Sequence, residues 1–148
     1  DEAVFNVVNK LHKKGIRRLY LAASTGMENP IHISRIFTAV RDRWPDLELG
    51  FHMHERTGMA AANMFAALNA GAKSVEGSIC GIGGGIAMPG GMGDIGNLPT
   101  EDIVNMLNRS DLDTGLDTDL ILTTAKKIET ILDIPSRSFA ARNKDIGV

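Results

Sequence analysis

The feature that most constrains the fold of this chain is a regular alternation of strand-like and helical segments. The sequence predicts strands at 17–22, 47–54 and 73–80, each followed further along the chain by a segment with helical periodicity. The predicted helices span about 4–14, 31–43, 57–70, a segment beginning at 100, and 117–132. Because strands joined through helical crossovers run parallel, this order predicts an α/β fold with a parallel sheet.

The faces of the predicted strands differ in polarity, which favours one kind of α/β fold. In the second strand, alternate apolar residues from Leu47 to Met53 share one face, and His52 and His54 share the other. A doubly wound sheet is covered by helices on both faces and would show continuous apolar strands. In a barrel, one face packs against helices and the other lines the interior. The strand faces therefore favour a (β/α)8 barrel.

Composition and charge exclude several classes of protein. The 148 residues carry a formal net charge of −2, which recommends neither a nucleic acid nor an anionic membrane as a partner. The single cysteine, Cys80, excludes a disulfide framework and favours a reducing, cytoplasmic setting. The sequence opens on an amphipathic helix without an initiator Met, so we expect a fragment of a longer protein.

His52 and His54 form the central motif. Residues i and i+2 of a strand share a face, with Cα atoms about 6.5–7 Å apart, so two imidazoles there can converge on one cation. Both lie at the carboxyl end of their strand, where barrel enzymes place their active sites. The spacing alone leaves a second interpretation open, in which the two histidines simply belong to a half-polar strand face.

A glycine-rich segment from Gly81 to Asn97 follows the third strand. Backbone of this composition can approach a ligand closely, and long loops in compact domains are usually functional, which favours an active-site lid over a plain surface loop. The segment is not a phosphate-binding P-loop, because no Gly-Lys-Ser/Thr follows it. Asn97, taken alone, is typical of a turn or a helix cap.

Two further residues have alternative interpretations. Strand alternation places Cys80 on the inward face with Glu76 and Ser78, although a lone cysteine in an apolar context is usually inert core. Arg56 follows the histidine pair and either holds a carboxylate or phosphate or is a solvated loop residue.

Taken together, these motifs resemble the hydroxymethylglutaryl-CoA lyase family of metal-dependent lyases and synthases. That group also includes isopropylmalate synthase, homocitrate synthase and 4-hydroxy-2-oxovalerate aldolase. The resemblance runs from about Val4 to Leu132 and is most specific in four segments. These are Gly50-Phe51-His52-Met53-His54-Glu55, Ala62-Asn63-Met64-Phe65-Ala66-Ala67-Leu68, Val75-Glu76-Gly77-Ser78-Ile79-Cys80-Gly81-Ile82-Gly83-Gly84 and Gly96-Asn97-Leu98-Pro99-Thr100-Glu101-Asp102.

The resemblance implies a TIM barrel with a divalent cation, Mg, Mn or Zn, as its cofactor. The family's His-x-His pair and the Asn after its glycine loop match His52, His54 and Asn97. Its fourth metal ligand, an Asp of the first barrel strand, has no counterpart here. A full barrel needs about 250 residues, so the chain would supply roughly the last four βα units. We expect residues 1–134 to form this C-terminal half-barrel and 135–148 to form a tail.

The sequence departs from the lyases at two positions that bear on acid–base chemistry. The lyases carry a cysteine where this chain has Gly85, and Asp-Thr where it has Ala23 and Ser24. The catalytic residues are therefore unknown, with Glu76, Arg56 and Ser24 as candidates.

The implied activity is cleavage of a carbon–carbon bond in a 3-hydroxyacyl-CoA such as 3-hydroxy-3-methylglutaryl-CoA. The alternatives are a related aldolase or synthase acting on another hydroxy or oxo acid, and a truncated, non-catalytic half-barrel. Expected partners are a small acyl-CoA or hydroxy-acid substrate, together with a second copy of the chain or a missing N-terminal half that completes the barrel, because a half-barrel leaves strand edges unpaired.

Overall fold

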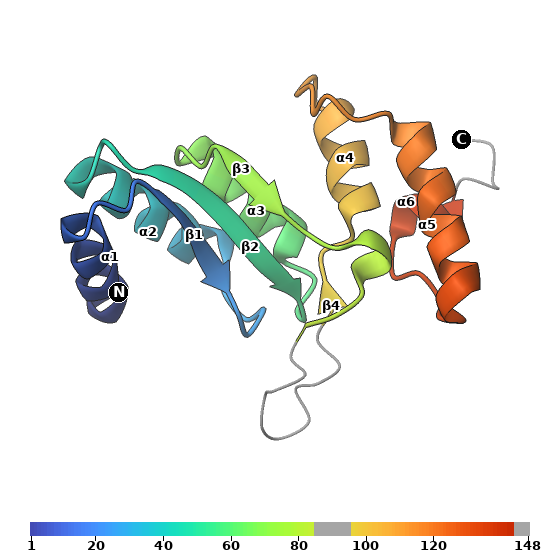
Figure 1. Cartoon of the computed structure of the whole chain (residues 1–148), viewed down its shortest axis with the longest axis horizontal. Coiled ribbons are helices and arrows are strands. Elements are labelled where there is room, and N and C mark those ends of the chain that lie inside the picture. Colours follow the sequence, from blue (N-terminus) through green and yellow to red (C-terminus); the bar gives the residue numbers. More distant parts are fainter. Residues whose placement is uncertain (85–95, 144–148) are drawn as a thin grey trace. The chain divides into compact units, whose positions relative to one another are not determined.

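The computed structural model describes residues 1–84 and 96–143 and divides the chain into two compact units, Asp1–Glu76 and Gly77–Val148 (Figure 1). Gly85 and most of the expected lid lie outside the described residues. Within the described ranges, no helix is both long and apolar enough to cross a bilayer.

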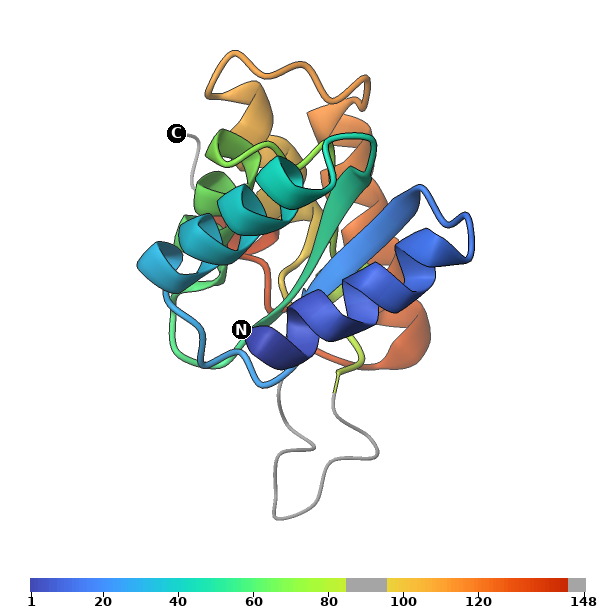
Figure 2. The same ribbon diagram turned by 90° about the vertical axis from the view of Figure 1, so that its left-hand side faces the viewer.

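The first unit is a parallel sheet with helical crossovers, which confirms the predicted α/β class. Strands β1 and β2 lie side by side and run in the same direction (Figure 2), and β3 pairs in parallel with the other side of β2. The elements in chain order are α1 (Glu2–Lys13), β1 (Arg18–Ala23), α2 (Pro30–Arg43), β2 (Glu48–Glu55), α3 (Ala60–Asn69) and β3 (Ser74–Glu76).

The core of the first unit forms where α2 and α3 pack on the apolar face of β2. Ile33, Ile36, Phe37 and Val40 of α2 are buried. The predicted apolar face of β2 is buried as well. Phe37 of α2 meets Phe51 of β2 edge to face, with ring centroids 5.4 Å apart. Burial of this one face leaves the opposite face of β2 to carry the histidines.

Local hydrogen bonds decide where the crossover helices begin. The Asn29 side chain accepts a hydrogen bond from the backbone of His32 at 3.0 Å and caps α2, with Pro30 in the first turn. Helix α3 begins at Ala60, three residues after the predicted start. The Glu55 carboxylate accepts from the backbone nitrogens of Gly58 and Ala60, and this holds the preceding segment in a turn.

The third strand is shorter than predicted and ends at Glu76. Cys80 lies instead in a 3-10 turn, η1 (Ile79–Gly81), with a left-handed φ of 56°. The prediction that Cys80 continues a strand alternation with Glu76 and Ser78 is therefore wrong. Cys80 is 1% exposed and packs against Leu122 and Ala125, as expected of a core thiol.

The second unit consists of η1, β4 (Gly96–Asn97), α4 (Thr100–Asn108), α5 (Thr118–Leu132) and α6 (Phe139–Asn143). Asp117 caps α5, its side chain accepting from the nitrogen of Leu120 at 2.9 Å. Helix α4 begins at Thr100, where the sequence predicts a helical segment to begin, and Pro99 is the residue before its first turn. Helix α6 was not expected, because its residues carry too little periodicity to predict it.

Candidate metal centre

The two histidines of β2 face each other on the polar side of the strand. The ring centroids of His52 and His54 are 4.9 Å apart, with the ring planes at 86°. The Nδ1 atom of each ring is buried, and within residues 1–84 and 96–143 neither has a hydrogen-bond partner. Buried nitrogen atoms are normally hydrogen-bonded, so these two Nδ1 atoms are candidate ligands for a cation.

Glu76 is the charged neighbour of this pair. His52 and Glu76 are register partners across β2 and β3, and the His52 Nδ1 atom lies 3.9 Å from the Glu76 carboxylate, beyond hydrogen-bond distance. Burial lowers the pKa of His52, the neighbouring His54 lowers it further, and Glu76 opposes both. The result favours a neutral His52, which is the form that binds metals.

Asn97 lies in β4 of the second unit and is 9% exposed. Its Nδ2 atom donates a hydrogen bond to the Ile82 carbonyl at 2.9 Å. Its Oδ1 atom is buried and has no partner in the described part of the chain. A buried amide oxygen with a free lone pair is a good ligand for a hard divalent cation.

Each predicted ligand therefore has a buried side-chain atom without a hydrogen-bond partner in the described part of its own unit. His52 and His54 offer imidazole nitrogens and Asn97 offers an amide oxygen, a mixed set that suits Mg²⁺, Mn²⁺ or Zn²⁺. Residues 1–84 and 96–143 contain no cluster of three or more His, Cys, Asp or Glu side chains that could hold an ion by themselves. Whether the three residues share a cation stays a prediction.

The loops that carry Ser24 and Arg56 lie against each other at the carboxyl edge of the first unit's sheet. Thr57 Oγ1 donates to the Gly26 carbonyl at 3.0 Å. A Cβ at Gly26 would be only 2.9 Å from the His54 carbonyl oxygen, so this close approach requires glycine. Ser24, Arg56 and Glu76 are all exposed.

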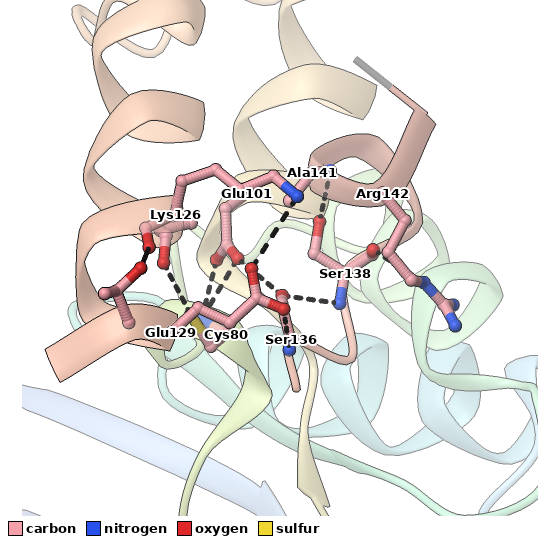
Figure 3. Close-up of polar contacts among 10 residues, drawn as sticks. Cys80, Glu101, Lys126, Glu129, Ser136, Ser138, Ala141 and Arg142 are labelled. Atoms are coloured by element: carbon pink, nitrogen blue, oxygen red, sulfur yellow. Dashed lines mark hydrogen bonds and ion pairs between the residues drawn. The ribbon is translucent and has the colours of Figure 1, made fainter. Parts of the chain in front are cut away.

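A buried carboxylate in the second unit was not predicted from the sequence. Glu101 is 0% exposed, and both of its oxygens lie 3.0 Å from the backbone nitrogen of Cys80. Figure 3 shows this carboxylate between Cys80 and Ser136, whose hydroxyl lies 3.4 Å away. Burial raises the pKa of Glu101, and the nearby Asp102 adds to the effect. In the sequence, Glu101 and Asp102 form an acidic pair at the start of a helix. Such a pair is equally typical of exposed acids that interact with the helix dipole, so it does not predict burial.

The adjacent acid, Asp102, binds the segment 138–140. Asp102 accepts hydrogen bonds from the Ser138 hydroxyl at 2.7 Å and from the backbone nitrogens of Phe139 and Ala140. Ser136 and Ser138 are both buried. Part of the predicted 135–148 tail is thus packed within the second unit, and the boundary at residue 134 stays a prediction.

Comparison with known proteins places the chain in a family. The model of the HMGL-like family matches residues 1–128. Hydroxymethylglutaryl-CoA lyase YngG of Bacillus subtilis is 35% identical over 139 residues, which cover 93% of this chain and 46% of that protein. The 4-hydroxy-2-oxovalerate aldolase of a Marinomonas species is 32% identical over 125 residues, 83% of this chain and 34% of the aldolase.

A solved structure agrees with these matches. The HMG-CoA lyase of Acinetobacter baumannii, in complex with coenzyme A and 3-methylmalate, superimposes with a TM-score of 0.87 at 32% identity. The match covers 95% of this chain and 45% of that lyase. The chain belongs to the HMGL-like family, and it spans less than half the length of these relatives.

Proposed function

We propose that this chain supplies the metal-binding part of a divalent-cation-dependent carbon–carbon lyase that cleaves a 3-hydroxyacyl-CoA such as 3-hydroxy-3-methylglutaryl-CoA. In this proposal the chain forms roughly the last four βα units of a TIM barrel. The observation that carries the proposal is the set of buried, unpartnered donor atoms on His52, His54 and Asn97 in a member of the HMGL-like family.

His52, His54 and Asn97 would hold the cation. Bound there, a divalent cation supplies Lewis-acid chemistry, because it lowers the pKa of a substrate hydroxyl and stabilises negative charge on a carbonyl oxygen. The two imidazoles need to be neutral to bind it, and the burial that lowers the pKa of His52 favours that form. The Glu76 carboxylate, 3.9 Å from the His52 Nδ1 atom, would orient this ring when the cation is bound.

The exposed residues at the same edge of the sheet have roles toward the substrate. Arg56 presents a planar guanidinium that can pair with the carboxylate of an acyl-CoA substrate. Cleavage needs a group that removes the hydroxyl proton and one that delivers a proton to the departing carbon. Glu76 and Ser24 are our candidates for these transfers.

An aldolase acting on a hydroxy or oxo acid is the second candidate. It is favoured by Gly85 at the position of the lyase cysteine and by a 4-hydroxy-2-oxovalerate aldolase relative at 32% identity. Cytoplasmic location, and completion of the barrel by a second copy or by another half, stay predictions.

Calorimetric titration of the chain with Mn²⁺ and Zn²⁺ tests the metal site. Stoichiometric binding that is lost in a His52→Ala/His54→Ala double variant is the expected result. The matched control is His12→Ala/His32→Ala, because those histidines pair with Asp46 and Asp1 instead. Equal binding by all three proteins would refute the assigned ligands.

The substrate is tested by turnover. With Mg²⁺ or Mn²⁺ present, cleavage of 3-hydroxy-3-methylglutaryl-CoA but not 4-hydroxy-2-oxovalerate supports the lyase, and the reverse supports the aldolase. Turnover of neither substrate, by a chain that binds metal, supports a non-catalytic half-barrel.

A further inference from the structure

We propose that Ser78 is a positioning residue for Asn97. The Ser78 hydroxyl and the Asn97 side-chain nitrogen bind one carbonyl group, that of Ile82, and this leaves the Asn97 oxygen as the atom free to bind a cation. The inference rests on the proposed function, because it deepens the role given there to Asn97.

The shared carbonyl decides which end of the Asn97 amide is free. Ser78 Oγ donates to the Ile82 oxygen, and Asn97 Nδ2 donates to the same oxygen at 2.9 Å. A carbonyl oxygen has two lone pairs, so it can accept both bonds. With its nitrogen engaged, the amide presents Oδ1, which is buried and lacks a partner among the described residues.

The backbone of Ser78 is tied to the segment that carries Asn97. Its nitrogen donates to the Leu98 carbonyl at 3.2 Å, and its carbonyl accepts from the Thr100 nitrogen at 2.9 Å. Ser78 and Pro99 form a parallel bridge. Ser78 therefore holds the segment beyond Asn97 through its backbone and the Ile82 carbonyl through its side chain.

The glycines on both sides of Ile82 cannot fix the orientation of the Ile82 carbonyl, so a side chain from outside residues 81–83 is needed to hold it. Gly81 and Gly83 have φ values of +67° and +81°, and a Cβ at Gly83 would lie 3.3 Å from Asn97 Nδ2. Glycine permits this close approach but supplies no side chain to fix the peptide plane. The Ser78 hydroxyl takes that role, so its removal frees the Ile82 carbonyl to turn away from Asn97.

The first readout needs no metal. In the ¹⁵N-labelled full chain, the side-chain amide resonances of Asn97 are identified by their loss in Asn97→Asp. We expect Ser78→Ala to shift these resonances and speed their exchange with water. The matched control is Ser110→Ala, because Ser110 Oγ also donates to a carbonyl four residues away, that of Met106. Unchanged Asn97 resonances in Ser78→Ala would overturn the inference.

The second readout is Mn²⁺ affinity by calorimetry. Loss of a group that orients a ligand typically weakens metal binding by about 10-fold or more, so we expect at least that loss in Ser78→Ala and none in Ser110→Ala. Ser78→Thr and Ser78→Val have the same shape and differ in the hydroxyl. Thr should keep the affinity and Val should lose it, which also covers the case in which the Ala variant fails to fold.

The outcomes separate this inference from the proposed function. If the unmodified chain binds no Mn²⁺, the proposed metal site fails, whereas the amide resonances still decide whether Ser78 orients Asn97. If the unmodified chain binds Mn²⁺ and the Thr and Val variants bind it equally well, the role of Ser78 fails and the metal site stands. If Ser78→Val still weakens binding when Asn97 is already Ala, Ser78 does not act through Asn97.

Discussion

Both carboxylate oxygens of Glu101 lie 3.0 Å from the backbone nitrogen of Cys80, and this fully buried acid is the side-chain acceptor for a residue held at a left-handed φ. Burying a carboxylate costs free energy unless hydrogen bonds compensate. Here the compensation is incomplete, because the pKa of Glu101 is raised above its usual 4.5.

The raised pKa predicts a pH dependence of stability. Below about pH 4.5 Glu101 is protonated in both folded and unfolded chains and has no effect. As the pH rises, the unfolded chain releases this proton first, so the free energy of unfolding falls until the folded pKa is passed. Relative to Glu101→Gln, the unmodified chain should lose stability as the pH rises above the unfolded value of about 4.5. Urea denaturation at pH values on both sides of about 4.5 measures the difference, with Glu2→Gln, at an exposed glutamate, as control. A difference that does not change with pH would contradict the prediction.

The contacts of Asp102 predict a large loss of stability on truncation. Asp102→Ala removes three hydrogen bonds, to Ser138, Phe139 and Ala140. It leaves the buried Ser138 hydroxyl and two part-buried backbone nitrogens without this acceptor. We expect a loss of about 2–3 kcal/mol in urea denaturation. Asp113→Ala, at an exposed aspartate that accepts only a local bond from Gly115, should change stability by less than about 0.5 kcal/mol. Similar losses in both variants would contradict the assignment.

The close approach of Gly26 to the His54 backbone predicts that one substitution will lower both stability and metal affinity. Gly26 and Gly58 both have positive φ, +62° and +77°, but only at Gly26 would a Cβ meet other atoms, the closest being the His54 oxygen. Gly58→Ala should cost about 1 kcal/mol, the backbone cost alone. Gly26→Ala should cost clearly more, and it should also weaken Mn²⁺ binding because it displaces the backbone of His54. Thermal unfolding and calorimetry measure both effects, and equal costs at the two glycines would argue against the close approach.

Metal binding predicts a stability increase. If the cation binds the folded chain only, Mn²⁺ at 100 times its dissociation constant should raise the free energy of unfolding by about 2.7 kcal/mol. Chelation should reverse the gain. The His52→Ala/His54→Ala variant should show no gain, and a gain of equal size in that variant would place the cation elsewhere.

Local sequence patterns were enough to predict the α/β class, the parallel direction of the strands and the shared strand face of the two histidines. Periodicity sufficed because strand alternation and helical spacing are local properties: the apolar face of β2 must be buried, which puts His52 and His54 together on the other face. The family resemblance, confirmed by the match over residues 1–128, rested on the same local motifs.

The buried polar contacts of the second unit became visible only in the folded chain, although its helices α4 and α5 were predicted from the sequence. Glu101, Asp102, Ser136 and Ser138 look like ordinary exposed polar residues, yet all four are buried because each satisfies backbone or hydroxyl groups distant in sequence. The left-handed turn at Cys80 is maintained by such a contact and leaves no periodic pattern. Hydrophobic periodicity reports which face of an element is buried, whereas the partners of buried polar groups are set by contacts between segments that only the folded chain brings together.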